Sequence, residues 1–318
     1  MIMAMAVLSA VLFSCVREEM TCDKELIVVQ RIGEGGYVYT RGTVISSNTD
    51  LKEETFGLYG SLTPNASVPQ PYFNASATVN ADLTATISPL QYWPGLLNAS
   101  MKFFSWYPYS DANAPTASFT DPGEMVLNYT ANASAANHVD VLAAISGPVW
   151  VEGVNILYHT LTKVTFTFKK VAPVPDEVII EKIEFQNVGK SGKLAMTEIP
   201  TTTTKNGKPK FVWSDVATGK VVSTLTDNKT VTEDATLMGD TFLMLPTDAF
   251  SATAKIVVTT NFGDREFLFS DILAKNPHSW ESGEYINYNL TISNETYQLS
   301  ATLLEWTESQ VNVIFDKQ

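Results

Sequence analysis

Short runs in which apolar and polar residues alternate recur along the chain, separated by glycine, proline, asparagine and serine. Successive side chains of a β-strand point to opposite faces of a sheet, so alternation with a period of two predicts half-buried strands. In residues 164–168, for example, Val164, Phe166 and Phe168 alternate with Thr165 and Thr167. Because no segment of useful length has a helical period, the sequence predicts an all-β protein.

The expected strands are defined by this alternation and by the turn residues at their ends. They cover residues 26–32, 37–45, 83–87, 101–107, 139–145, 155–168, 178–185, 241–245, 255–261, 285–292 and 311–315. Many short strands with regular turn signals are typical of β-sandwiches and barrels.

Two prolines close together, Pro173 and Pro175, mark the expected domain boundary. Proline cannot donate a hydrogen bond to a strand neighbour, so the segment 171–176 belongs between sheets. A chain of 318 residues is long enough for two domains of about 150 residues each. We therefore expect an N-terminal β-sandwich over residues 42–170 and a C-terminal β-sandwich over residues 171–318.

The first fourteen residues are mostly apolar and carry no charge, and Cys15 follows them directly. This run is shorter than the roughly 20 residues of a membrane-spanning helix and fits a secretory signal peptide. Residues 12–15, Leu-Phe-Ser-Cys, resemble the lipobox of bacterial lipoproteins. We therefore expect residues 1–14 to be removed and Cys15 to be lipidated and held in the outer membrane. No lysine or arginine precedes the run, which leaves open a start further upstream.

The charge of the chain argues against one class of partner, and its cysteine content argues against stabilisation by disulfides. The chain has 34 acidic against 21 basic residues, a net charge of −13, which disfavours binding to nucleic acid. If Cys15 carries lipid, Cys22 is the other cysteine and has no partner for a disulfide. Packing must then stabilise the fold.

The sequence lacks the usual catalytic and metal-binding motifs. Its three histidines, His138, His159 and His278, are scattered, and there is no His-Glu-x-x-His, Cys-x-x-Cys, Gly-x-Ser-x-Gly or calcium-binding Asp-x-Asp-x-Asp-Gly pattern. We interpret His159 as a hydrogen-bonded structural residue. The expectation is a protein that is not an enzyme and that binds no cofactor or metal.

Two aromatic segments, residues 92–94 and 103–109, are the alternative candidates for a binding surface. Aromatic rings can form a platform on which a sugar stacks. In a strand, however, Phe103 and Tyr107 point to one face while Phe104 and Trp106 point to the other, and one face should be core. Packing is therefore favoured over glycan binding.

Several segments together resemble the fimbrillin family of Bacteroidetes, which are lipoprotein precursors of fimbrial subunits. They are the lipobox at Cys15, Thr40-Arg41-Gly42, Trp93-Pro94, and the segments 102–109, 140–144, 159–166, 280–288 and the one around Trp306. Each motif is weak alone, but their order and spacing extend over nearly the whole chain. Residues 17–19, Arg-Glu-Glu, also resemble the acid-rich signal that sends lipoproteins of these bacteria to the outer surface.

The resemblance implies two tandem transthyretin-like Greek-key β-sandwiches and a defined assembly step. In this family an Arg-specific protease removes an N-terminal strand, and a strand of the neighbouring subunit fills the groove that opens. Here residues 15–41 would be the anchor and removable strand, with cleavage after Arg41 and Arg31 as second choice. The partners are then other fimbrial subunits, the protease and the outer membrane.

The last predicted strand is a candidate donor for this exchange. Val311, Val313 and Phe315 share one face of residues 311–315, close to the C-terminus. The segment suits either a last strand of its own domain or a donor to a neighbour. The sequence thus predicts a structural fimbrial subunit used in adhesion, at the cell surface. A monomeric surface lipoprotein that binds glycans through exposed aromatics is the alternative.

Overall fold

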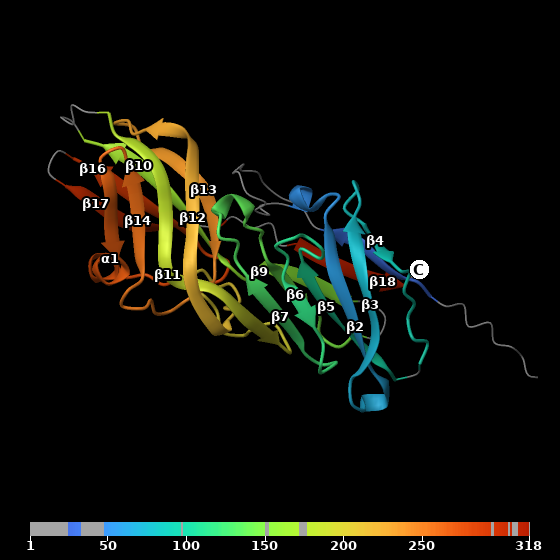
Figure 1. The fold of residues 1–318 in the computed structure, drawn as a ribbon. Coiled ribbons are helices and arrows are strands. Elements are labelled where there is room, and N and C mark those ends of the chain that lie inside the picture. Colours follow the sequence, from blue (N-terminus) through green and yellow to red (C-terminus); the bar gives the residue numbers. More distant parts are fainter. Residues whose placement is uncertain are drawn as a thin grey trace, which may run out of the picture.

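The structure is a computed structural model that describes residues 25–32, 48–96, 98–149, 153–171, 177–293, 296–304, 306 and 311–317. The regular secondary structure of this part of the chain is almost entirely strand, which confirms the all-β prediction (Figure 1). Its helical segments are short: η1 (Asn48–Leu51), η2 (Pro64–Ala66), η3 (Ala135–Asn137) and α1 (Phe269–Lys275). No helix in these ranges is long and apolar enough to cross a membrane.

The first group of strands closes into a barrel in the order β1-β18-β9-β8-β5-β2-β3-β4. Its strands are β1 (Ile27–Ile32), β2 (Thr55–Thr63), β3 (Gln70–Val79), β4 (Ala85–Ser88), β5 (Ser100–Tyr107), β8 (Leu142–Ile145), β9 (Gly153–His159) and β18 (Val311–Lys317). Neighbouring strands run antiparallel all the way round. Apolar side chains from these strands, among them Leu58 and Phe103, fill the interior.

The second group forms two sheets that pack face to face. One has the order β13-β10-β16-β17, with strands β10 (Thr162–Lys170), β13 (Thr236–Met244), β16 (Tyr285–Ile292) and β17 (Tyr297–Leu304). The other has the order β15-β14-β11-β7-β6, with β12 also on β11; its strands are β6 (Thr116–Ser118), β7 (Met125–Thr130), β11 (Ile179–Met196), β12 (Ser214–Thr230), β14 (Lys255–Thr260) and β15 (Gly263–Leu268). A large apolar core lies between the two sheets.

The alternating faces predicted in two segments meet in this core. β10 and β16 are parallel neighbours, and their register pairs Val164 with Ile286, Phe166 with Tyr288, and Phe168 with Leu290. All six side chains are at most 1% exposed. On the opposite face the Thr165 hydroxyl donates to the amide oxygen of Asn287 at 2.8 Å. Alternation therefore assigned both faces correctly.

The strand predicted over residues 155–168 is wrong, because the chain turns in its middle. β9 ends at His159 and β10 begins at Thr162, and the two strands belong to different sheets. At the turn the Thr160 N–H and hydroxyl both donate to the Val141 carbonyl, at 2.9 and 2.8 Å. Thr and Leu are compatible with strands, so composition gave no sign of this turn.

Strands from the two predicted halves pair across the expected boundary at residue 171. β6 and β7 extend the sheet of β11, β10 lies between β13 and β16, and β18 returns to the barrel. In Figure 1 the long strand β11 runs from the second group of strands towards the barrel and β7. Of the expected linker, residues 171–176, all but Val171 lie outside the described residues, and the tandem Greek-key arrangement stays a prediction.

A third apolar core joins the barrel to the long sheet. The outer face of β5 contributes Phe104 and Trp106, and β7 and β11 contribute Leu127 and Leu194. Both faces of β5 are therefore buried, which makes the junction a packed interior.

His138 is a buried polar link at this junction. Its side chain is 1% exposed, its Nε2 lies 3.0 Å from the Asn132 carbonyl oxygen, and its Nδ1 accepts the Leu243 N–H at 2.9 Å. These partners require the neutral ring, because a proton on Nδ1 would face the Leu243 N–H. Burial lowers the pKa of His138 to about 4.

This arrangement predicts a pH-dependent loss of stability. The unfolded chain takes up a proton at His138 near its ordinary pKa of 6.5, whereas the folded chain does so only at about 4. The contribution of His138 to the free energy of unfolding is complete above the unfolded-state pKa. Below that pKa it falls by about 1.4 kcal/mol per pH unit, and the total loss is about 3 kcal/mol. Urea unfolding across this range should show a steeper decline for the wild type than for His138→Gln. Parallel curves would contradict the assignment.

The close contact between Gly57 and its neighbour in the barrel wall predicts that a larger residue at this position destabilises the fold. Gly57 pairs with Trp106 across β2 and β5, and a Cβ at this position would lie 2.1 Å from two atoms of the indole ring. Gly57→Ala should therefore cost about 1–3 kcal/mol of unfolding free energy. Gly147→Ala is the matched control, because a Cβ there meets nothing within 4 Å. Equal stability of the two variants in chemical denaturation would refute the clash.

Candidate strand-exchange site

The first and last described strands of the chain are direct neighbours in the barrel. β1 and β18 pair antiparallel from Ile27 opposite Lys317 to Ile32 opposite Val313. The register shifts between Val29 and Arg31, as in a β-bulge. The segment expected to be removed and the segment expected to act as donor therefore share one ladder.

The other edge of β1 is held by β4 and the loop that follows it. Val29 pairs with Ala85, the Ile27 N–H donates to the Gln91 carbonyl at 2.8 Å, and the Trp93 N–H donates to the Glu25 carbonyl at 2.8 Å. β1 thus fills the space between β18 and β4 and completes the barrel.

Two side chains of β1 enter the barrel core. Ile27 and Val29 are each 2% exposed and belong to the same apolar cluster as Trp93 and Phe103. Leu26 and Val28, which alternate with them, are only half-buried. Full burial of an aliphatic side chain is worth about 1.5–3 kcal/mol, so loss of β1 would uncover an apolar trough between two unpaired strand edges.

The predicted donor residues all lie in β18, between β1 and β9. Val311 pairs with Leu157 of β9, Val313 lies opposite Ile32 on one side, and Phe315 lies opposite Val29. In this chain the C-terminal strand is thus a strand of its own barrel. Its exchange with a neighbour stays a prediction.

The structure places one of the two predicted cleavage residues. The backbone of Arg31 lies within β1 and pairs with Ile314. Paired strands are poor protease substrates, since cleavage concentrates at exposed loops. Arg41 and the predicted lipidation site Cys15 lie outside the described residues.

The aromatic residues that could have bound a glycan are mostly buried. Phe103 and Phe104 are fully buried, and Trp106 and Tyr107 are 4% and 2% exposed. Phe103 packs edge-on against Trp93, with ring centroids 5.7 Å apart, inside the barrel. Packing, the favoured interpretation, accounts for these side chains on both faces of the strand.

The three histidines have hydrogen-bonded or ion-paired positions within the fold. His138 links the junction as described above, His159 Nδ1 lies 2.8 Å from Asp140 Oδ2, and His278 Nε2 lies 2.8 Å from the Tyr288 hydroxyl. Burial lowers the pKa of His278. Within the ranges the structure describes, no group of three or more His, Cys, Asp or Glu side chains is arranged to hold a metal ion.

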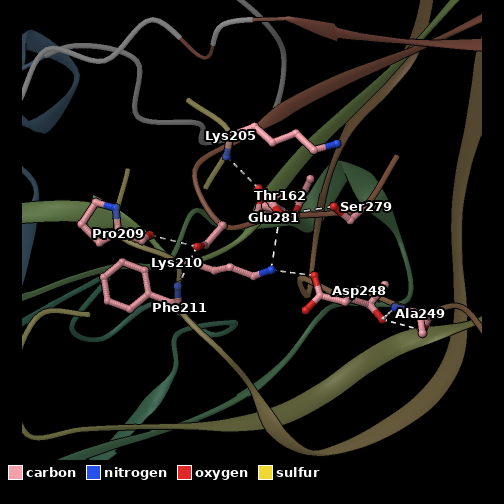
Figure 2. Close-up of polar contacts among 11 residues, drawn as sticks. Thr162, Lys205, Pro209, Lys210, Phe211, Asp248, Ala249, Ser279 and Glu281 are labelled. Carbon is pink, nitrogen blue, oxygen red and sulfur yellow. Dashed lines mark hydrogen bonds and ion pairs between the residues drawn. The ribbon is translucent and has the colours of Figure 1, made fainter. Parts of the chain in front are cut away.

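A polar network that the sequence did not reveal binds residues 202–210, here called the lysine-containing tract, to the turn before β16 (Figure 2). Glu281, 7% exposed, accepts the backbone N–H of Lys205 at 3.2 Å and pairs with the Lys210 ammonium at 3.3 Å. Lys210 also donates to Asp248 at 2.7 Å, and this bond raises the pKa of Lys210. By composition this tract is a surface loop, so only the fold brings its lysines to Glu281.

Solved structures share this fold over most of the chain. A fimbrial protein from Bacteroides vulgatus matches with a TM-score of 0.57 at 14% identity, over 87% of this chain and 100% of that one. A putative cell adhesion protein from Bacteroides uniformis matches with a TM-score of 0.55 at 15% identity, over 90% and 99% of the two chains. At these identities the likeness concerns the fold alone. A search of curated proteins returned no match.

A family model identifies the chain by sequence. The model described as fimbrillin-like matches residues 40–306, which is most of the chain and leaves out both terminal strands, β1 and β18. This confirms the resemblance found in the sequence motifs. The chain belongs to the fimbrillin-like family.

Proposed function

We propose that this protein is a structural subunit of an adhesive fimbria on the bacterial surface, assembled by strand exchange after proteolytic removal of β1. Membership of the fimbrillin-like family supports the fimbrial role, and the fold is shared with proteins described as fimbrial or cell-adhesion proteins. The observation that carries the assembly step is the pairing of β1 with β18.

Removal of β1 would change the barrel in two ways at once. It would open a trough at the positions of Ile27 and Val29, with unpaired backbone on β18 and β4. It would also take away one of the two partners of β18, which would then be held by β9 alone. An incoming strand restores the lost hydrogen bonds and apolar contacts, which is β-augmentation. Cleavage thereby creates both an acceptor and a loosened donor.

We propose further that the precursor is anchored through lipid on Cys15. Several acyl chains, each worth about 0.8 kcal/mol per buried methylene, hold a protein at a membrane durably. Cleavage after Arg41 would release the subunit from this anchor together with β1, because both precede the cut. One proteolytic event then serves both detachment and assembly.

Glycan binding by a monomer is less well supported. The aromatic residues that suggested it, Phe103 to Tyr107, are buried in two cores, while Tyr92 and Tyr109 remain 36% and 39% exposed. Burial of the ring faces leaves no extended platform among these residues.

The proposed cleavage after Arg41 predicts that substitution of the two candidate arginines has different effects on processing. Arg41→Ala should leave the precursor uncut by an Arg-specific protease, whereas Arg31→Ala, the matched control, should be processed normally because Arg31 lies within a paired strand. Mass spectrometry of the mature N-terminus and a gel of the oligomers check both variants. An unchanged N-terminus in Arg41→Ala would contradict this assignment.

If β18 is the exchanged strand, a disulfide that holds it on β9 should block assembly. Asn155 and Val313 are partners in the β9–β18 ladder, and directly opposed residues of an antiparallel pair are close enough for a disulfide. The double variant Asn155→Cys and Val313→Cys should fold and be processed, but should polymerise only after a reductant is added. Cleavage at Arg41 removes both native cysteines, so the engineered pair is then the sole source of thiols.

A second lock in the same barrel is the control. Thr55 and Thr78 are partners in the β2–β3 ladder, with their hydroxyl oxygens 3.0 Å apart. Thr55→Cys with Thr78→Cys should polymerise with or without reductant, since neither strand is exchanged. Polymers of normal length from the oxidised β9–β18 variant would show that β18 is not the donor.

A further inference from the structure

Trp306 is a buried residue between the last strand of the second group and the C-terminal strand. Leu303 and Leu304, at the end of β17, are 40% and 37% exposed, whereas Trp306 is 3% exposed. β18 begins at Val311. The chain is thus buried at Trp306 after β17 ends and before β18 begins.

The indole ring lies in a set of stacked and charged side chains. It stacks on the His159 imidazole with ring centroids 3.8 Å apart and planes 28° apart, and His159 Nδ1 lies 2.8 Å from the fully buried carboxylate of Asp140. The Lys163 ammonium lies 5.7 Å from the indole centroid and 4.8 Å from that of Tyr285. Cations and planar rings at these distances attract an indole face.

The backbone of Trp306 is fixed as well. The Lys208 ammonium donates to the Trp306 carbonyl at 2.9 Å and to the Gly283 carbonyl at 3.2 Å. Lys208 belongs to the same tract as Lys205 and Lys210, which are fastened to Glu281 (Figure 2). Both the ring and the main chain of Trp306 are thereby tied to the second group of strands.

These contacts do not depend on the strands that are expected to move. Asp140, Lys163 and Lys208 lie outside β1 and β18, and His159 lies beyond Leu157, the last β9 residue in register with β18. Loss of β1, or departure of β18, therefore leaves the partners of Trp306 in place.

We propose that Trp306 is the fixed pivot of strand exchange: β18 leaves its barrel while Trp306 stays docked on His159. This inference rests on the proposed function and deepens it, because it sets the start of the exchanged segment after residue 306. From Trp306 to Val311 the extended chain spans about 17 Å at most. The pivot therefore holds a donor strand close to the body of its own subunit and fixes the spacing between neighbours.

Hydrogen exchange read by mass spectrometry tests the pivot in the full-length precursor before and after cleavage by an Arg-specific protease. In the cleaved monomer, separated from polymers by size exclusion, the amides of β18 should lose protection, while residues 158–163 and 204–210 should keep the protection that they have in the precursor. Trp306→Ala should lose protection in those two segments, and Trp306→Phe, which keeps a stacking ring, should retain most of it. The variants measure how much of the protection the docked ring provides.

Two outcomes overturn the pivot. In one, residues 158–163 and 204–210 of the cleaved wild type lose protection together with β18, which would mean that Trp306 leaves with the strand. In the other, β18 of the cleaved monomer keeps its protection, which would mean that the strand does not leave its barrel while Trp306 stays docked. A gel of the whole cleavage reaction judges the proposed function separately: polymers together with either of these exchange patterns in the monomer reject the pivot alone, whereas complete absence of polymers rejects strand-exchange assembly.

Discussion

Pairing between the two ends of the described chain closes the barrel. A closed barrel has no free strand edge, so each strand needs two neighbours, and β1 and β18 are neighbours of each other. Their residues are separated by nearly the whole sequence. Such a contact depends on everything between the ends being folded, because loop closure must be offset by other contacts first. Removal of β1 would therefore leave one edge of β18 and one edge of β4 unpaired.

The second group of strands packs directly against the barrel. β11 pairs with β14 through one half of its length and with β7 through the other, so one strand carries both the core between the sheets and the junction. His138 ties the loop after β7 to β13 by hydrogen bonds on both ring nitrogens. The Lys163 ammonium lies over the rings of both Trp306 and Tyr285, and Lys208 donates to the Trp306 carbonyl. Interior packing thus continues from the barrel into the sandwich.

Some elements could be read from the sequence because only one of their two faces is apolar. Residues 285–292 match β16, and the faces of 164–168 and 286–290 were assigned correctly, since period-two alternation records which side of a strand is apolar. Alternation fails where both faces are apolar. β5 is buried on both sides by the barrel core and the junction core, so its aromatic residues carried no signal of orientation. The turn at Thr160 was missed because its residues are compatible with strands, and its hydrogen bonds to Val141 come from a separate segment.

The amino-acid sequence was sufficient to predict the all-β class, the family, and a strand near each end of the chain. Local alternation, turn residues and motif order carry that information, since each depends on neighbours in the chain. The three-dimensional fold was needed to show that β18 returns to the barrel beside β1, that Trp306 stacks on His159, and that Glu281 contacts Lys205 and Lys210. These contacts join residues far apart in sequence, and a single chain records no pattern from which such pairings follow. Strand partners are chosen by the packing of whole sheets, because the backbone hydrogen bonds of any two strands are nearly the same.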